Sequence, residues 1–200
     1  MQTEDLLRHL IAFPTVSCEP NLALITFCAD VLRHVGAEVT VIEDDTAAKA
    51  NLYATIGPKD RPGVLLSGHT DVVPVAGQHW TVPPFELTET DGKLFGRGTA
   101  DMKGFVACAM AAALRAANMD LKTPLHLGLS YDEEVGCLGV RSMIDMLAAA
   151  PLRPQMCIVG EPTGMAVATG HKGKTSARLN TVGHARHSAL APNALNAIHM

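Results

Sequence analysis

Apolar patterns of strand and helix type alternate along most of this chain, and that alternation limits the folds open to it. Short apolar runs with strand spacing occur at 38–42, 51–56, 64–67, 125–131 and 156–159. Longer patterns with helical spacing occur at 4–13, 21–35, 103–117 and 136–150. Strands and helices in this order build helical layers on a mainly parallel sheet. We therefore predict an α/β fold with a mixed, largely parallel sheet flanked by helices.

The composition favours a folded chain with an aliphatic core. Hydrophobic residues make up 48% of the 200 residues and aromatic residues only 4%, which argues against disorder. The chain has a net charge of −4, whereas a nucleic-acid-binding protein needs an excess of basic residues on its binding surface. The longest strongly apolar run, Phe105 to Leu114, falls short of the roughly 20 residues of a membrane span. We expect neither nucleic acid nor membrane as a partner.

Five scattered cysteines without a C-x-x-C pair predict reduced thiols rather than a disulfide framework. We expect each of them to be a small buried apolar group. The N-terminal segment carries acids where a signal peptide has basic residues. Together these features predict a cytoplasmic protein.

The pattern changes near residue 173. Lys174–Val182 alternates like an exposed strand, and Asn193–Met200 begins a helix that the end of the chain cuts off. We therefore predict one domain over 1–173, the start of a second over 174–200, and a chain that is a fragment.

Four segments with acidic or imidazole side chains lie at predicted strand ends or helix starts, where open α/β sheets place their ligand sites. They contain His69 and Asp71, then Asp101, then Glu133 and Glu134, and finally Glu161. Each segment alone has an ordinary explanation. These are a histidine beside an acid in a turn, a helix N-cap, solvated loop acids, and a turn with an exposed glutamate.

Taken together, the four segments predict a metal centre. If they meet, five carboxylates converge on one imidazole. Like charges about 4 Å apart repel by about 4 kcal/mol at an effective dielectric of about 20, and several such pairs approach the whole stability of a domain, about 5–15 kcal/mol. Divalent cations neutralise this repulsion. Mixed imidazole and carboxylate ligands suit zinc, with cobalt or manganese as substitutes, and a shared carboxylate suits two metals.

These motifs carry a family resemblance over essentially all 200 residues. They read Ser-Gly-His-Thr-Asp-Val-Val-Pro (67–74), Gly-Arg-Gly-Thr-Ala-Asp-Met-Lys-Gly (96–104), Asp-Glu-Glu-Val-Gly (132–136) and Gly-Glu-Pro-Thr (160–163). The chain resembles the di-zinc peptidase family of aminoacylases, acetylornithine deacetylases and succinyl-diaminopimelate desuccinylases. The segments 84–98, 130–139 and 169–173 look most like the deacetylase branch.

The resemblance implies two zinc ions, with cobalt possible as a substitute. His69, Asp101 and Glu161 would hold one zinc, and Asp101 would bridge to a second zinc that Glu134 also holds. The remaining histidine ligand of the second zinc would lie beyond Met200, together with most of a lid domain. The chain would then be inactive or feeble by itself.

The resemblance also implies catalytic roles. Glu133 would be the general base, Asp71 would hydrogen-bond His69, and the Asp101–Met102 peptide would be cis. His187, at what looks like the start of a lid and dimerisation domain, would stabilise the oxyanion in the partner subunit of a homodimer. A surface or helix-cap histidine is the plainer interpretation of His187.

The activity implied is zinc-dependent hydrolysis of a small-molecule N-acyl amino acid. In the deacetylase branch this is conversion of N2-acetyl-L-ornithine to L-ornithine and acetate in arginine biosynthesis. Two alternatives stay open. One is the same chemistry on succinyl-diaminopimelate, on another N-acyl amino acid or on a short peptide. The other is a non-catalytic relative used for binding or dimerisation.

Overall fold

The computed structural model describes residues 1–170, 172–173 and 175–199 and divides the chain into two compact units, Met1–Met165 and Ala166–Met200. Each unit is described by itself. The first unit contains the predicted metal-binding segments. The predicted domain boundary at residue 173 remains a prediction.

The first unit alternates strands and helices as the sequence predicts. Its helices are α1 (Thr3–Ala12), α2 (Leu22–His34), α3 (Lys103–Ala116) and α4 (Arg141–Ala149). Its strands are β1 (Glu38–Glu43), β2 (Ala50–Ile56), β3 (Val64–His69), β4 (Thr88–Thr90), β5 (Lys93–Phe95), β6 (Leu125–Ser130) and β7 (Met156–Val159). The largest shift from prediction is the start of α4, because residues 136–140 form a loop in which Gly136 and Cys137 have positive φ.

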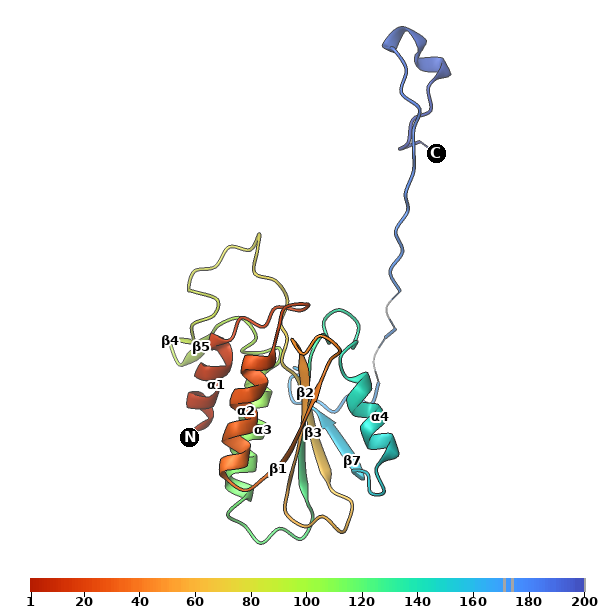
Figure 1. Ribbon diagram of the computed structural model, residues 1–200. Coiled ribbons are helices and arrows are strands. Elements are labelled where there is room, and N and C mark those ends of the chain that lie inside the picture. Colours follow the sequence, from red (N-terminus) through yellow and green to blue (C-terminus); the bar gives the residue numbers. More distant parts are fainter. Residues whose placement is uncertain (171, 174, 200) are drawn as a thin grey trace. The chain divides into compact units, whose positions relative to one another are not determined.

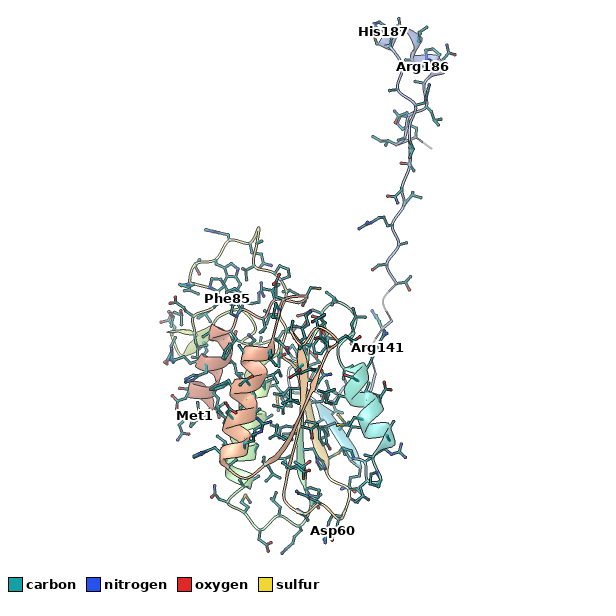
Figure 2. The ribbon with its side chains drawn as sticks, in the orientation of Figure 1. Met1, Asp60, Phe85, Arg141, Arg186 and His187 are labelled. Carbon is teal, nitrogen blue, oxygen red and sulfur yellow. The ribbon has the colours of Figure 1, made fainter. Side chains whose placement is uncertain are left out.

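A five-stranded mixed sheet in the order β1-β2-β6-β3-β7 forms the centre of the unit (Figure 1). The β1–β2 and β2–β6 pairs are antiparallel, whereas β3 pairs in parallel with both β6 and β7. The register places His69 opposite Ser130. The carboxyl ends of β3, β6 and β7 therefore share one edge of the sheet. Asp60, labelled in Figure 2, lies in the loop that leads into β3 at the opposite end of that strand.

Helices cover both faces of the sheet. Figure 1 shows α1, α2 and α3 together on one face and α4 on the other, and α2 and α3 contact each other as well as the strands. The prediction of a helix at 103–117 is confirmed by α3, which buries residues along most of its length. The core is aliphatic, with Leu6, Leu24, Met110 and Leu127 fully buried. None of the described helices has the length and apolar character needed to cross a bilayer.

The long stretch from Thr70 to Gly92, irregular for most of its length, leads into a hairpin that the sequence analysis did not predict. Strands β4 and β5 form an antiparallel hairpin with Thr90 opposite Lys93. Its turn residues Asp91 and Gly92 have φ values of 52° and 68°. An Asp-Gly pair supplies the two positive φ values of a type I′ hairpin turn. The Asp91-Gly92 dipeptide is therefore the sequence feature that could have predicted this hairpin.

The local predictions for the second unit are wrong. Residues 175–182 form no strand, and 194–199 form no helix. Instead the unit contains a short 3₁₀ helix, η1 (Ser188–Asn193), and an isolated bridge between His184 and Leu195 on either side of it. An alternating pattern becomes a strand only where a partner takes up its backbone hydrogen bonds. Lys174 and Met200 lie outside the described residues.

The cysteine expectation holds only in part. All five thiols are free, but only Cys28 is buried, while Cys18, Cys108, Cys137 and Cys157 are exposed. Sequence alone assigned them to the core because cysteine is usually among the most buried residue types.

Candidate metal centre

The shared sheet edge gathers six of the seven predicted site residues. His69 is the last residue of β3, and Asp71 follows it in the same segment. Two more acids follow β6, one follows β7, and one precedes α3; these are Glu133, Glu134, Glu161 and Asp101. Each acid is therefore placed by the end of a regular element rather than by a long free loop.

His187 belongs to the second unit, which is described by itself. Its Nδ1 accepts a hydrogen bond from the backbone N–H of Ala189 at 3.2 Å and caps η1. This is the helix-cap geometry that the plainer interpretation predicts. The catalytic role of His187 remains a prediction.

The His69 imidazole is the centre of the cluster. Its side chain is 1% exposed, and its Nε2 lies 3.2 Å from Asp101 Oδ1. The same nitrogen is 3.8 Å from Glu133 Oε2 and 3.8 Å from Glu161 Oε1. Three carboxylates from three segments thus surround one ring nitrogen.

Two sets of potential ligand atoms include this imidazole. His69, Glu133 and Glu161 offer atoms within 4.8 Å of one another, and so do His69, Asp101 and Glu134. One nitrogen with several carboxylate oxygens is a donor set that zinc accepts, so these residues fit a divalent metal. The trio implied by the resemblance, His69 with Asp101 and Glu161, is divided between the two sets. The assignment of ligands to individual metals remains a prediction.

Asp71 orients the His69 imidazole through contacts with its Nδ1. The His69 Nδ1 lies 2.8 Å from the backbone carbonyl of Asp71 and 3.4 Å from its carboxylate Oδ1. Donation from Nδ1 leaves Nε2 free to face the carboxylates, which is the usual arrangement for an imidazole ligand. The closer of the two contacts is made by the main chain of Asp71.

The carboxylate of Asp71 also holds the loop after β6. It accepts hydrogen bonds from the backbone N–H of Glu133 at 3.0 Å and of Glu134 at 3.3 Å. The hydroxyl of Ser17 donates to it at 2.7 Å. Burial opposes the charged form of Asp71, but hydrogen bonds from His69, Ser17 and the Glu133 backbone outweigh it and lower the pKa of Asp71. The sequence analysis missed Ser17, since no local pattern links it to a segment more than fifty residues away.

The electrostatics of the cluster favour a bound cation. Burial opposes the charged form of His69, but the hydrogen bond and charge of Asp71 and the charge of Glu161 raise the pKa of His69 to about 9. Burial and the charge of Asp101 raise the pKa of Glu134. The pKa of Glu161 is raised for the same two reasons. The carboxylates thus resist ionising together, and a divalent cation relieves that repulsion.

The backbone around Asp101 has the form implied by the resemblance. The Asp101–Met102 peptide is cis. The sulfur of Met102 lies 3.3 Å from the backbone nitrogen of His69, which donates to it. This contact joins the start of α3 to the end of β3 beside the cluster.

Asp132, the first acid of the run 132–134, belongs to neither set of potential ligand atoms. It has a φ of 53° and is buried. Its Oδ2 lies 2.6 Å from Lys49 Nζ, and its Oδ1 accepts from the backbone N–H of Cys18 at 2.9 Å. Asp132 therefore anchors the loop, which leaves Glu133 and Glu134 at the cluster.

Lys103 is a buried residue whose role the sequence analysis missed. Its ammonium donates to the backbone carbonyls of Leu10 at 2.9 Å and Phe13 at 2.7 Å. Burial lowers its pKa to about 7. The sequence feature that could have indicated this contact is a lysine at the start of a helix that is apolar from there up to Arg115. Its contacts fasten the start of α3 to the end of α1.

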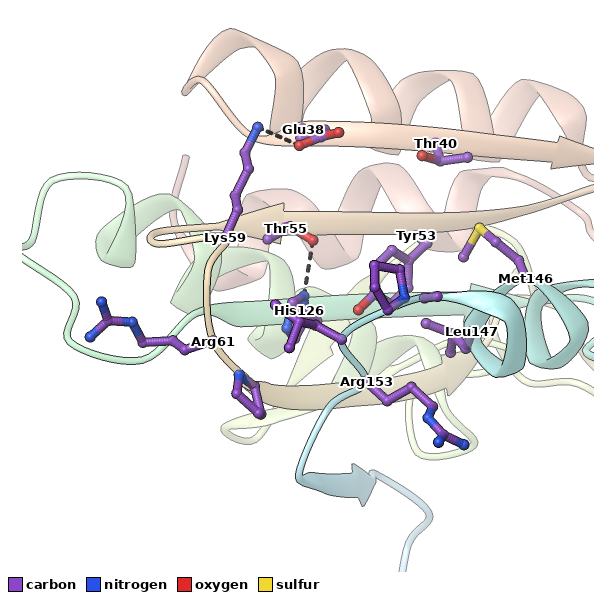
Figure 3. A pocket seen from close by; sticks show the side chains of 14 residues that line it. Glu38, Thr40, Tyr53, Thr55, Lys59, Arg61, His126, Met146, Leu147 and Arg153 are labelled. Atoms are coloured by element: carbon purple, nitrogen blue, oxygen red, sulfur yellow. Dashed lines mark hydrogen bonds and ion pairs between the residues drawn. The ribbon is translucent and has the colours of Figure 1, made fainter.

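The described part of the first unit has one hollow beside the cluster and another away from it. One, of about 260 Å³, adjoins the cluster and is lined by Arg97, Thr99, Asp101 and Glu134 among others. The other, of about 350 Å³, lies between the sheet and α4 and is lined by Tyr53, His126 and Arg153 among others (Figure 3). None of the predicted site residues lines the larger hollow. The chemistry of the cluster therefore belongs to the smaller one.

Comparison with known proteins agrees with this geometry. The sequence profile of Peptidase family M20/M25/M40 matches residues 65–197. An acetylornithine deacetylase from Shigella sonnei (strain Ss046) is 39% identical over 203 residues, covering 98% of this chain and 52% of that protein. The chain thus spans about half the length of this curated relative.

Solved structures support the fold. Human carnosine dipeptidase 1 superposes with a TM-score of 0.65 at 24% identity, covering 78% of this chain and 38% of that one. The M20 family metallo-carboxypeptidase Sso-CP2 from Sulfolobus solfataricus gives a TM-score of 0.70 at 19% identity, covering 80% and 37%. At these identities the likeness concerns the architecture.

Proposed function

Because the chain belongs to peptidase family M20/M25/M40, we propose that it is part of a zinc-dependent amide hydrolase that removes the acyl group from an N-acyl amino acid. The substrate we propose is N2-acetyl-L-ornithine, cleaved to L-ornithine and acetate in arginine biosynthesis. The similarity to an acetylornithine deacetylase along nearly the whole chain supports this substrate.

The observation that carries the proposal is the convergence of carboxylates from three segments on His69 Nε2. We propose that His69, Asp101, Glu134 and Glu161 hold two zinc ions, with cobalt as a possible substitute. When bound, the metals supply Lewis acidity that polarises the acyl carbonyl and lowers the pKa of the attacking water.

Glu133 is the proposed general base. Its carboxylate lies 3.8 Å from His69 Nε2 and is 37% exposed, so a water molecule and a substrate can reach it. Its backbone is fixed by Asp71, which keeps the base in one place. In this role Glu133 takes a proton from the attacking water and passes it to the leaving amine.

The proposal extends beyond this chain. Since the chain spans about half the length of its curated relative, we propose that a longer protein supplies the last ligand of the second metal and the rest of a lid domain begun at 174–200. In that protein, two copies pair through the lid, and His187 stabilises the oxyanion in the partner's site. Five free thiols support a cytoplasmic location.

Parallel assays of the longer protein test the proposal. Zinc-loaded protein is expected to hydrolyse acetylornithine faster than succinyl-diaminopimelate, and a chelator is expected to abolish both activities. Faster turnover of succinyl-diaminopimelate would replace the proposed substrate. A protein that binds zinc but hydrolyses neither compound, nor any other N-acyl amino acid or dipeptide, would support a non-catalytic relative.

A further inference from the structure

Trp80 and Arg97 form a stacked pair beside the proposed metal centre. The guanidinium carbon of Arg97 lies 4.9 Å from the centroid of the Trp80 ring. Trp80 belongs to the long irregular stretch before β4, whereas Arg97 belongs to the glycine-rich segment before α3. The backbone N–H of Arg97 donates to the Pro84 carbonyl at 2.6 Å, which fixes the segment against that stretch.

Both members of this pair carry an unused hydrogen-bond donor. Among the described residues, three buried side-chain polar atoms lack a partner: Asn51 Oδ1, Trp80 Nε1 and Arg97 Nε. The first is an acceptor on β2, and the other two are N–H donors of the stacked pair. Buried donors without partners are rare in folded proteins and call for an explanation. Two of them in adjoining groups point to an acceptor that binds both.

The position of Arg97 connects this pair to the metal centre. Arg97 lines the hollow of about 260 Å³ that Asp101 and Glu134 also line. Among the described residues that line this hollow, Arg97 is the one cation, and the other charged residues, Asp101 and Glu134, are acidic. An anionic group that enters this hollow meets repulsion from the carboxylates and finds its complementary charge at Arg97.

Gln78 occupies one edge of the guanidinium in the structure. Its amide Oε1 accepts a hydrogen bond from Arg97 Nη2, its Nε2 donates to the Pro74 carbonyl at 3.1 Å, and the residue is exposed. A neutral amide oxygen is a weaker acceptor for a guanidinium than a carboxylate, which can bind two N–H groups at once. Gln78 is therefore replaceable by a ligand that offers two negative oxygens.

We propose that Arg97 and Trp80 bind the carboxylate of the substrate, which takes the place of the Gln78 amide and accepts from Arg97 Nε and Trp80 Nε1. The inference rests on the proposed function and specifies it further: the pair selects N-acyl amino acids with a free carboxylate over the corresponding amides. Arg97 and Trp80 are thus specificity-determining residues and take no part in proton transfer.

The single tryptophan of the chain makes this site directly observable. Zinc-loaded chain is titrated with N-acetylglycine or N-acetylglycinamide at constant ionic strength, with Trp80 fluorescence as the readout. We expect a saturable change with the acid, and binding of the amide at least about tenfold weaker, as for loss of one hydrogen bond to a charged group. Equal responses to the two compounds, or a response to added salt alone, would overturn the proposal.

Three variants sharpen the test. Arg97→Met is expected to weaken N-acetylglycine binding at least about tenfold, whereas Arg115→Met, which alters an exposed arginine at the end of α3, is expected to leave it unchanged. Gln78→Ala removes the competing amide and is expected to tighten binding. Unchanged binding in Arg97→Met, or unchanged or weaker binding in Gln78→Ala, would contradict the inference. Circular dichroism confirms folding, and Gln78→Ala remains decisive if Arg97→Met unfolds.

This binding test needs no turnover, so its failure is separable from failure of the proposed function. If the chain binds the carboxylate selectively but the longer protein hydrolyses nothing, the Arg97 site is supported and the proposed hydrolase activity is contradicted. If the longer protein hydrolyses acids and amides at equal kcat/KM, the hydrolase activity is supported and the carboxylate selectivity of Arg97 is contradicted.

Discussion

The carboxylate of Asp71 accepts a hydrogen bond from the backbone N–H of Glu133 at 3.0 Å. This bond joins the residue that orients the imidazole to the proposed general base, across 62 positions of sequence. The same carboxylate accepts from Glu134 and from Ser17. A single buried acid thus fixes three parts of the cluster.

Replacing Asp71 is expected to weaken metal binding. Asp71→Ala removes the acceptor for the Glu133 and Glu134 backbone, and loss of such a supporting partner typically costs about 10–100-fold in metal affinity. Asp71→Asn keeps an oxygen in place and should lose less. Competition with a chromogenic chelator measures the zinc affinity, with Asp60→Ala, in an exposed loop pair with Arg61, as control. Parent-like zinc affinity in Asp71→Ala would contradict this role.

The two glutamates after β6 are expected to separate chemistry from metal binding. Glu133→Ala should lower kcat by at least about 100-fold, the lower end of general-base contributions, while zinc content stays near that of the parent. Glu134→Ala should instead deplete zinc. Elemental analysis after dialysis and turnover of the longer protein give the two readouts. Because Glu133 also lies within one candidate ligand set, zinc loss in Glu133→Ala would reassign it as a ligand.

Gly160 is expected to tolerate no side chain. A Cβ at this position would lie 1.9 Å from Phe105 Cγ and 2.1 Å from its Cδ2. We expect Gly160→Ala to lower the free energy of unfolding by about 1–3 kcal/mol, as overpacking does, and to weaken zinc binding because Glu161 is the next residue. Gly170→Ala is the matched control, since a Cβ there meets nothing within 4 Å. Urea denaturation tests both, and equal stability of the two variants would refute the clash.

Cys28 is expected to resist alkylation in the folded chain. Burial raises the pKa of its thiol to about 12, with the charge of Lys103 opposing the shift in part. Iodoacetamide at pH 8.5 should modify the four exposed cysteines in the native chain and all five after unfolding. Mass spectrometry identifies the labelled sites. Native labelling of Cys28 at the rate of the exposed thiols would contradict its burial.

The same thiol predicts a pH dependence of stability. Its folded pKa lies above the ordinary value of 9.0, so the folded state retains the proton that the unfolded state loses. The contribution is fully present below pH 9 and is lost as the pH rises towards 12. Between these values the free energy of unfolding should fall more steeply in the parent than in Cys28→Ala. Parallel slopes in denaturant titrations would show that the thiol does not contribute.

The sequence by itself determined the elements of the first unit other than the β4–β5 hairpin, and the positions of its chemistry. Periodicity located the buried helix α3, and the motifs placed acids at the ends of β3, β6 and β7. These features are predictable because side-chain spacing along a segment reports which face is buried. The mixed sheet and the family follow from the same local patterns.

Only the tertiary structure decided which side chains meet. The run 132–134 does not reveal that Asp132 pairs with Lys49 while Glu133 and Glu134 face the cluster. Nor does any local pattern reveal the bond from Ser17 to Asp71. Such contacts depend on strand order and register, which bring distant segments together. The failed strand at 175–182 has the same cause, because a pattern without a pairing partner does not settle its own conformation.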